Sequence, residues 1–85
     1  MRLVFRRAAE KALDRIQADR RGQILTRLKE LAAEPTSRGA DVKPLSGATS
    51  LRLRVGDYRV LFSVDDAEGT LTVELIRTRG DVYKR

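Results

Sequence analysis

The side chains able to do chemistry in this 85-residue sequence are mostly arginines. The 18 Lys and Arg residues outnumber the 12 Asp and Glu residues and leave a net charge of +6, and 14 of those 18 cations are Arg. The sequence contains no His and no Cys. It therefore has no imidazole base, thiolate nucleophile, disulfide or ordinary zinc site. Catalysis would have to use Arg, Lys, Tyr, Ser, Thr or carboxylates.

The positive charge predicts an anionic partner, with nucleic acid as the first candidate and an acidic protein as the second. A generic basic surface is the alternative. The length fits one domain spanning residues 1–85. The apolar runs are too short to span a membrane, and the basic N-terminus is not followed by the apolar stretch of a signal peptide. We therefore expect a cytoplasmic protein that does not contact membranes.

The pattern of apolar residues predicts an α+β domain in the order β-α-α-β-β-β. Alternating or continuous apolar residues indicate strands, and a three-to-four residue spacing indicates helices. A two-helix hairpin should cover one face of a mostly antiparallel, four-stranded sheet. The predicted strands are 1–5, 51–55, 58–64 and 70–76, and the predicted helices are 8–17 and 19–33, with Asp19 as N-cap of the second. Residues 36–48 are predicted to form a connecting loop.

A two-residue turn at Gly56 and Asp57 would fix the register of the hairpin that surrounds it. Val55 would then pair with Tyr58, and Arg54 would pair with Arg59. Because side chains alternate between the two faces of a sheet, Arg52, Arg54 and Arg59 should share the face away from the helices. Like charges placed opposite each other destabilise a sheet, so this face favours a bound anion. Arginine stems that simply cover an open sheet face are the alternative.

The C-terminal end of the sequence adds Arg77, Arg79, Tyr83, Lys84 and Arg85. Strict alternation from Leu75 would turn Arg77 and Arg79 toward the helices, where two charges are improbable. The consecutive apolar residues Leu75 and Ile76 indicate a β-bulge or a strand end nearby. After such a break, Arg79 would rejoin the arginine-bearing face.

Three segments together resemble the RelE/ParE superfamily of bacterial toxins. They are KPLSG at 43–47, LRLRVGDYRVLF at 51–62 and RGDVY at 79–83. The resemblance covers essentially the whole chain and implies the toxin of a type II toxin–antitoxin system. RelE-like members cleave mRNA on the ribosome through attack of a ribose 2′-OH, without a metal or other cofactor. ParE-like members share the fold, inhibit DNA gyrase and lack the cleavage residues.

The resemblance also assigns roles to individual positions. Catalytic positions of RelE-like enzymes fall on Arg52, Arg59, Arg79 and Tyr83, with Tyr83 stacking on a base or transferring a proton. Contacts to the backbone phosphates of RNA are expected from Arg54, Lys84 and Arg85. The neutralising antitoxin is expected to carry an acidic segment.

One departure from the RelE-like pattern affects the chemistry. Two lysines are usual on the strand after the loop, and here their positions are occupied by Ser50 and Arg52. Arginine is not deprotonated in proteins, so Arg52 cannot be a general base. Tyr83, another group, the ribosome or water would have to accept the proton. A ribosome-dependent mRNA endonuclease is therefore the first hypothesis, and a gyrase inhibitor or an inactive basic binding module are the alternatives.

Overall fold

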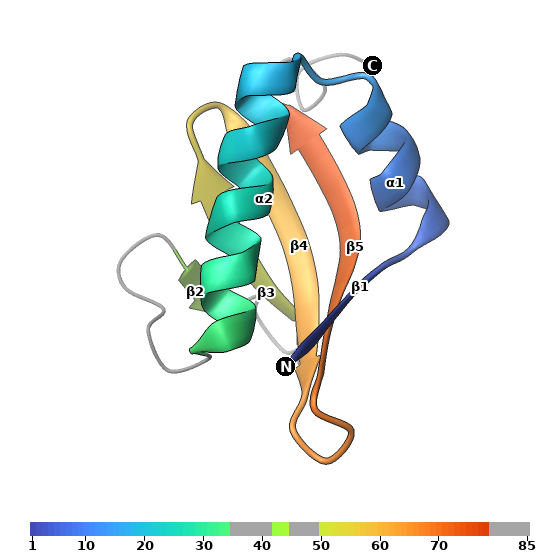
Figure 1. Cartoon of the computed structure of the whole chain (residues 1–85), viewed down its shortest axis with the longest axis vertical. Coiled ribbons are helices and arrows are strands. Elements are labelled where there is room, and N and C mark those ends of the chain that lie inside the picture. The colour runs from blue at the N-terminus through green and yellow to red at the C-terminus, as the bar shows by residue number, and fades with distance from the viewer. Residues whose placement is uncertain (35–41, 45–49, 79–85) are drawn as a thin grey trace.

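The computed structural model describes residues 1–34, 42–44 and 50–78 as a five-stranded sheet with two helices on one face (Figure 1). In chain order the elements are β1 (Arg2–Phe5), α1 (Arg7–Asp14), α2 (Ala18–Ala33), β2 (Val42–Pro44), β3 (Ser50–Val55), β4 (Tyr58–Asp65) and β5 (Thr70–Thr78). The strands lie in the order β1-β5-β4-β3-β2. Only β1 and β5 pair in parallel, and the other three pairs are antiparallel. The predicted α+β class and the order of its elements are confirmed.

The short strand β2 corrects the predicted loop over residues 36–48. Val42 pairs with Leu53, and β2 thereby adds a fifth strand at the edge of the predicted four-stranded sheet. Sequence patterning missed this strand because three residues are too few to show a period. The second helix also begins earlier than predicted. Gln17 occupies the N-cap position, and Asp19 lies in the first turn.

The two helices run antiparallel and cover the same face of the sheet (Figure 1). Helix α1 packs on β5, while α2 lies over β1 and β3. Ile24, Leu28 and Leu31 recur at helical spacing along α2 and are almost completely buried. The Met1 ammonium also donates a hydrogen bond of 2.6 Å to the Ala32 carbonyl oxygen at the end of α2. No helix among the described residues is long and apolar enough to cross a membrane.

The register of the β3–β4 hairpin agrees with the prediction at each predicted pair. Val55 pairs with Tyr58, and Arg54 pairs with Arg59. Gly56 has a φ of 58°, and among the described residues no side-chain-bearing residue has a positive φ. A positive φ at the first turn position alone is the type II′ pattern, which matches the natural twist of two antiparallel strands.

This register directs alternate residues of β3 and β4 into the core. Leu53, Val60 and Phe62 are at most 1% exposed, whereas their neighbours in sequence are partly or fully exposed. On β5, Leu71 and Val73 continue the buried set. The helix-facing side of the sheet is thus the apolar core that fixes the position of the opposite side.

We predict that Phe62→Ala lowers the free energy of unfolding by about 3–5 kcal/mol, because it leaves a cavity beneath α2. Leu61→Ala is the matched control, since Leu61 is the adjacent residue and faces the other side of the sheet. It should cost about 1 kcal/mol or less. Urea denaturation of both variants measures the difference. Equal losses would show that the helix-facing side is not the main core.

Candidate functional site: an arginine-bearing sheet face

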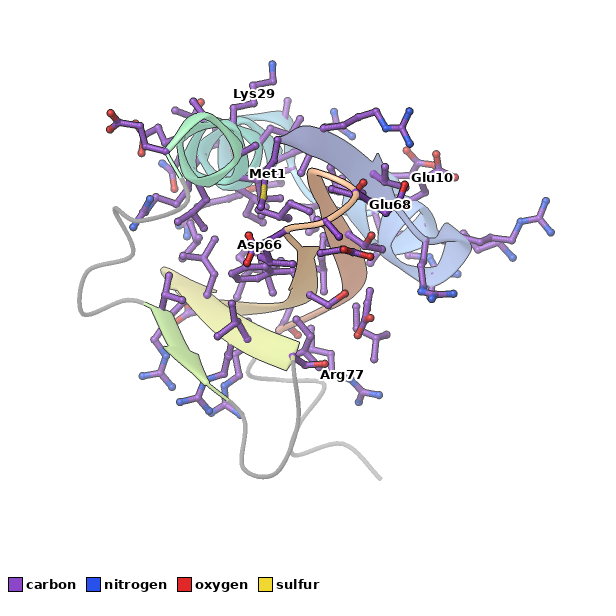
Figure 2. All side chains as sticks on the ribbon, turned by 90° about the horizontal axis from the view of Figure 1, so that it is seen from below. Met1, Glu10, Lys29, Asp66, Glu68 and Arg77 are labelled. Carbon is purple, nitrogen blue, oxygen red and sulfur yellow. The ribbon has the colours of Figure 1, made fainter. Side chains whose placement is uncertain are left out.

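The candidate site is the sheet face opposite the helices, which we call the outer face. Pairing and alternation place twelve residues of the three longest strands on it. They are Ser50, Arg52, Arg54, Arg59, Leu61, Ser63, Asp65, Thr70, Thr72, Glu74, Leu75 and Arg77. The side chain of Arg77 extends away from α2 (Figure 2). No described helix packs on this face, and each of these residues is partly or fully exposed.

Three arginines lie in one register line across three neighbouring strands. Arg54 on β3 pairs with Arg59 on β4, and Arg59 pairs in turn with Arg77 on β5. We call these three residues the arginine row. Neighbouring strands lie about 4.8 Å apart, so the row spans roughly 10 Å of backbone. Arg52 lies two residues from Arg54 on the same face and pairs with Lys43 of β2.

Arg77 enters this row because of a bulge in β5. Leu61 pairs with Leu75 while the next residue, Phe62, pairs with Val73, so Glu74 is an extra residue on β5. The bulge indicated by the consecutive apolar residues is confirmed. It makes Ile76 the buried residue instead of Leu75 and turns Arg77 outward. Strict alternation from Leu75, which would have turned Arg77 toward the helices, fails for this reason.

Arg77 is therefore an outer-face residue to which the sequence pattern gave no role. The signal that could have found it was present, since a break before Ile76 shifts every following residue to the opposite face. The sequence prediction extended that shift only to Arg79. Its consequence for Arg77 depends on where the extra residue lies, and the sequence alone does not fix that position.

No carboxylate neutralises the arginines within the part of the chain that the structure describes. Ser63 donates a hydrogen bond of 3.1 Å from Oγ to Glu74 Oε2, and Glu74 forms no ion pair with Arg52 or with the arginine row. Ser63 lies four residues from Arg59, or roughly 13 Å along the strand. The Glu74 carboxylate therefore cannot balance the row directly. Among the described residues the positive charge of the outer face thus has no counter-charge, and this favours an external anion.

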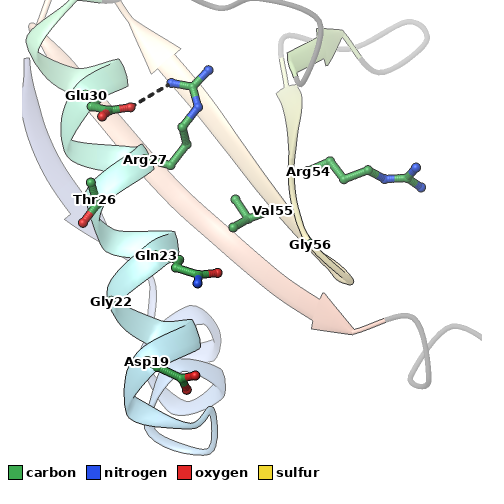
Figure 3. A pocket seen from close by; sticks show the side chains of 9 residues that line it. All are labelled: Asp19, Gly22, Gln23, Thr26, Arg27, Glu30, Arg54, Val55 and Gly56. Carbon is green, nitrogen blue, oxygen red and sulfur yellow. Dashed lines mark ion pairs between the residues drawn. The ribbon is translucent and has the colours of Figure 1, made fainter.

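A separate groove lies between α2 and the start of the β3–β4 turn (Figure 3). It is open, has a volume of about 680 Å³ and is lined on the helix side by polar residues that include Asp19 and Glu30. Arg27 Nη1 lies 3.6 Å from Glu30 Oε1 across one turn of α2. Arg54 borders the groove, but its side chain extends away from α2. The groove thus belongs to the helix side and not to the outer face.

The structure brings three of the seven predicted site residues together on the outer face. These are Arg52, Arg54 and Arg59. The other four, Arg79, Tyr83, Lys84 and Arg85, lie outside the described residues. In the described ranges, no group of three or more Asp and Glu residues is arranged to hold a metal ion. What the arrangement can do chemically is bind phosphate through several guanidinium groups at once.

Comparison with known proteins gives this face its context. The family model described as the ParE toxin of the type II toxin–antitoxin system parDE matches residues 3–83. The chain belongs to this toxin family. The predicted resemblance to the RelE/ParE superfamily is thereby confirmed. A search of curated proteins gave no match.

Solved structures with this fold come from bacteria and archaea. The archaeal RelE–RelB complex from Pyrococcus horikoshii OT3 is 29% identical, with a TM-score of 0.81 over 93% of this chain and 94% of that chain. The YoeB/ParE toxin from Agrobacterium tumefaciens is 20% identical, with a TM-score of 0.78 over 92% of this chain and 98% of that chain. The intact E. coli RelBE complex is 21% identical, with a TM-score of 0.77 over 91% and 94%. The last two likenesses establish the fold alone.

We predict that the arginine row weakens the folded toxin in the absence of a ligand. Arg54→Gln removes one like-charge cross-strand pair, so the free energy of unfolding should rise by roughly 0.2–1 kcal/mol at low salt. The gain should shrink as salt screens the repulsion. Arg2→Gln is the control, because Arg2 is also exposed but pairs with Thr70. Urea denaturation at two salt concentrations measures both, and a loss of stability in Arg54→Gln would contradict the prediction.

Proposed function

We propose that this toxin is an endoribonuclease that cleaves mRNA on the ribosome, with the outer face as its phosphate-binding site. The observation that carries the proposal is the arginine row, in which Arg54, Arg59 and Arg77 lie in register without a carboxylate partner among the described residues. Guanidinium groups bind phosphate oxygens in pairs and keep their charge at any physiological pH. Like charges in one register line destabilise a sheet, so folding alone gives no reason for the arginine row.

In the proposed reaction a ribose 2′-oxygen attacks the adjacent phosphorus and the bond to the 5′-oxygen breaks. The products are a 2′,3′-cyclic phosphate and a free 5′-hydroxyl. No water is consumed in this step, because the 2′-OH gives up one proton and the leaving 5′-oxygen takes up one. Negative charge grows on the phosphate oxygens in the transition state, where fixed cationic donors are most effective. Arg59 and Arg79 would hold these oxygens, and Arg52 would orient the phosphate or the leaving 5′-oxygen. Arg77, next to Arg59 in the row, is added to this set.

The proton of the 2′-OH needs an acceptor, and the described part of the outer face has few candidates. Its arginines cannot accept a proton. Ser50 and Ser63 are weak bases, and Glu74, the extra residue of β5, accepts a hydrogen bond from Ser63 and forms no ion pair with the arginine row. We propose that Tyr83, a ribosomal group or water accepts the proton, with Tyr83 also able to stack on a base. Lys84 and Arg85 would contact the RNA backbone together with Arg54.

A gyrase inhibitor is the second candidate function, and two observations favour it. The matching family model describes ParE toxins, and the sequence has Ser50 and Arg52 where RelE-like enzymes have lysines. In that case the outer face would act by binding alone, without covalent chemistry.

For either activity we propose that a cognate antitoxin neutralises the toxin. RelE–RelB complexes are among the solved structures with this fold. An acidic segment of the antitoxin would complement the arginine row and compete with phosphate for it.

The first test is induced expression of the toxin without its antitoxin. We expect growth arrest, and mapping of mRNA 5′ ends should show new ends inside translated codons. Arg59→Ala and Arg79→Ala should each reduce cleavage by about 10²–10³-fold, which is typical of removing one donor that stabilises a developing oxyanion. Arg2→Ala is the control, because Arg2 is an exposed arginine on β1, away from the row.

The same experiment separates the alternatives. Intact transcripts together with gyrase-linked DNA breaks would replace the endonuclease by the gyrase inhibitor. Normal growth with the toxin expressed alone would refute both activities and leave a basic binding module.

A further inference from the structure

Two leucines interrupt the outer face of β3, β4 and β5, which is otherwise polar. Of the twelve outer-face residues on β3, β4 and β5, only Leu61 and Leu75 are apolar. They pair with each other across the two strands, and both remain partly exposed. Neither belongs to the core or packs against it. A solvated sheet face is normally polar throughout, so this apolar pair needs a reason beyond the core.

The leucine pair lies directly beside the phosphate-binding residues. Leu61 is two residues from Arg59 on β4, and Leu75 is two residues from Arg77 on β5. Two residues of strand correspond to roughly 7 Å, comparable with the distance from a phosphate to the base of the same nucleotide. On the β3 side, Arg52 pairs with Leu61. The two leucines therefore form a small apolar patch on the outer face, and arginines border this patch on two sides.

We infer that Leu61 and Leu75 form a platform for a nucleobase of single-stranded RNA, while the arginine row binds the neighbouring phosphates. This inference rests on the proposed function and extends it to the substrate side of the same site. A base has a flat apolar face that two paired side chains on a sheet can cover. Aliphatic side chains have no hydrogen-bonding groups, so the platform tolerates any base and contributes affinity without choosing a sequence.

A protein segment fits the leucine pair less well than a nucleotide does. An amphipathic helix binds through apolar anchors spread over several turns, and two adjacent leucines offer only one contact point. Addition of a strand needs a free sheet edge. Leu61 lies on β4, which is paired on both sides, whereas β5 pairs with β1 only up to Val73, so its edge is free of a described strand at Leu75. A strand added there would extend the sheet beside Leu75 and would not lie over the leucine pair.

The test measures binding of a short single-stranded oligoribonucleotide to the full-length toxin by fluorescence anisotropy. A 2′-deoxy residue at each position where cleavage is seen prevents cleavage during the measurement. Leu61→Ser combined with Leu75→Ser should weaken binding about tenfold, the order expected when the apolar contact of two side chains is lost. Leu61→Phe should strengthen binding, because an aromatic ring stacks on a base more effectively than leucine. A purely structural role for the leucines would not produce changes in opposite directions.

Two controls make the result specific. Val4→Ser changes another partly exposed aliphatic residue, on β1 beside Thr72 and away from the arginine row, and should leave binding unchanged. An oligoribonucleotide in which the bases are replaced by abasic residues should bind the wild type more weakly. The double serine variant should bind the abasic and the intact oligoribonucleotide equally well, because this variant has already lost the contact to the base.

The outcomes distinguish this inference from the proposed function. If Arg59→Ala weakens RNA binding and the leucine variants do not, the platform is refuted and the phosphate site stands. If the leucine variants weaken only the antitoxin complex, the platform is likewise refuted, and the leucine pair belongs to a protein interface. If the wild type neither binds the oligoribonucleotide nor cleaves mRNA, the proposed function itself fails.

Discussion

Strand β4 lies between β3 and β5 and pairs with both, and its alternation of side chains organises the whole molecule. Val60 and Phe62 point into the core beneath the helices, while Arg59 and Leu61 point to the opposite face. Because the side-chain period of a strand is two residues, a slip of one residue would exchange these two sets. The free energy of burying the core thus holds the arginines in position. The site needs no contacts of its own to be assembled.

Two local features keep that register on either side of β4. Toward β3, the tight turn at Gly56 leaves no spare residue, and the glycine supplies the positive φ that a type II′ turn requires. Toward β5, the extra residue Glu74 changes the face of every residue that follows it. Without this bulge, Ile76 would be exposed and Arg77 would face the core. The turn therefore aligns Arg54 with Arg59, and the bulge aligns Arg59 with Arg77.

The arginine row lowers the conformational stability of the folded chain and at the same time provides several cationic groups that can bind an anion. Three arginines in one register line repel one another, and no described carboxylate offsets them. The opposite face supplies the compensation, since several large apolar side chains there are almost completely buried. A ligand rich in phosphate, or an acidic segment of an antitoxin, would convert the repulsion into attraction. Membership of a toxin family fits a protein that spends part of its existence bound to a neutralising partner.

The sequence by itself determined the fold class, the helix and strand order, and the pairing of β3 with β4. These features depend on short-range patterns. The spacing of apolar residues indicates the helices and strands, and together with the two-residue turn it permits only one register for the β3–β4 hairpin. The absence of His and Cys also excludes imidazole and thiolate chemistry whatever the fold. The short strand β2 was missed, because its three residues are a strand only through pairing with β3. The outward position of Arg77 likewise depended on the tertiary structure. Which residue of β5 is extra is decided when Val73 and Ile76 both enter the core opposite Phe62 and Val60, a long-range packing choice that no local pattern encodes.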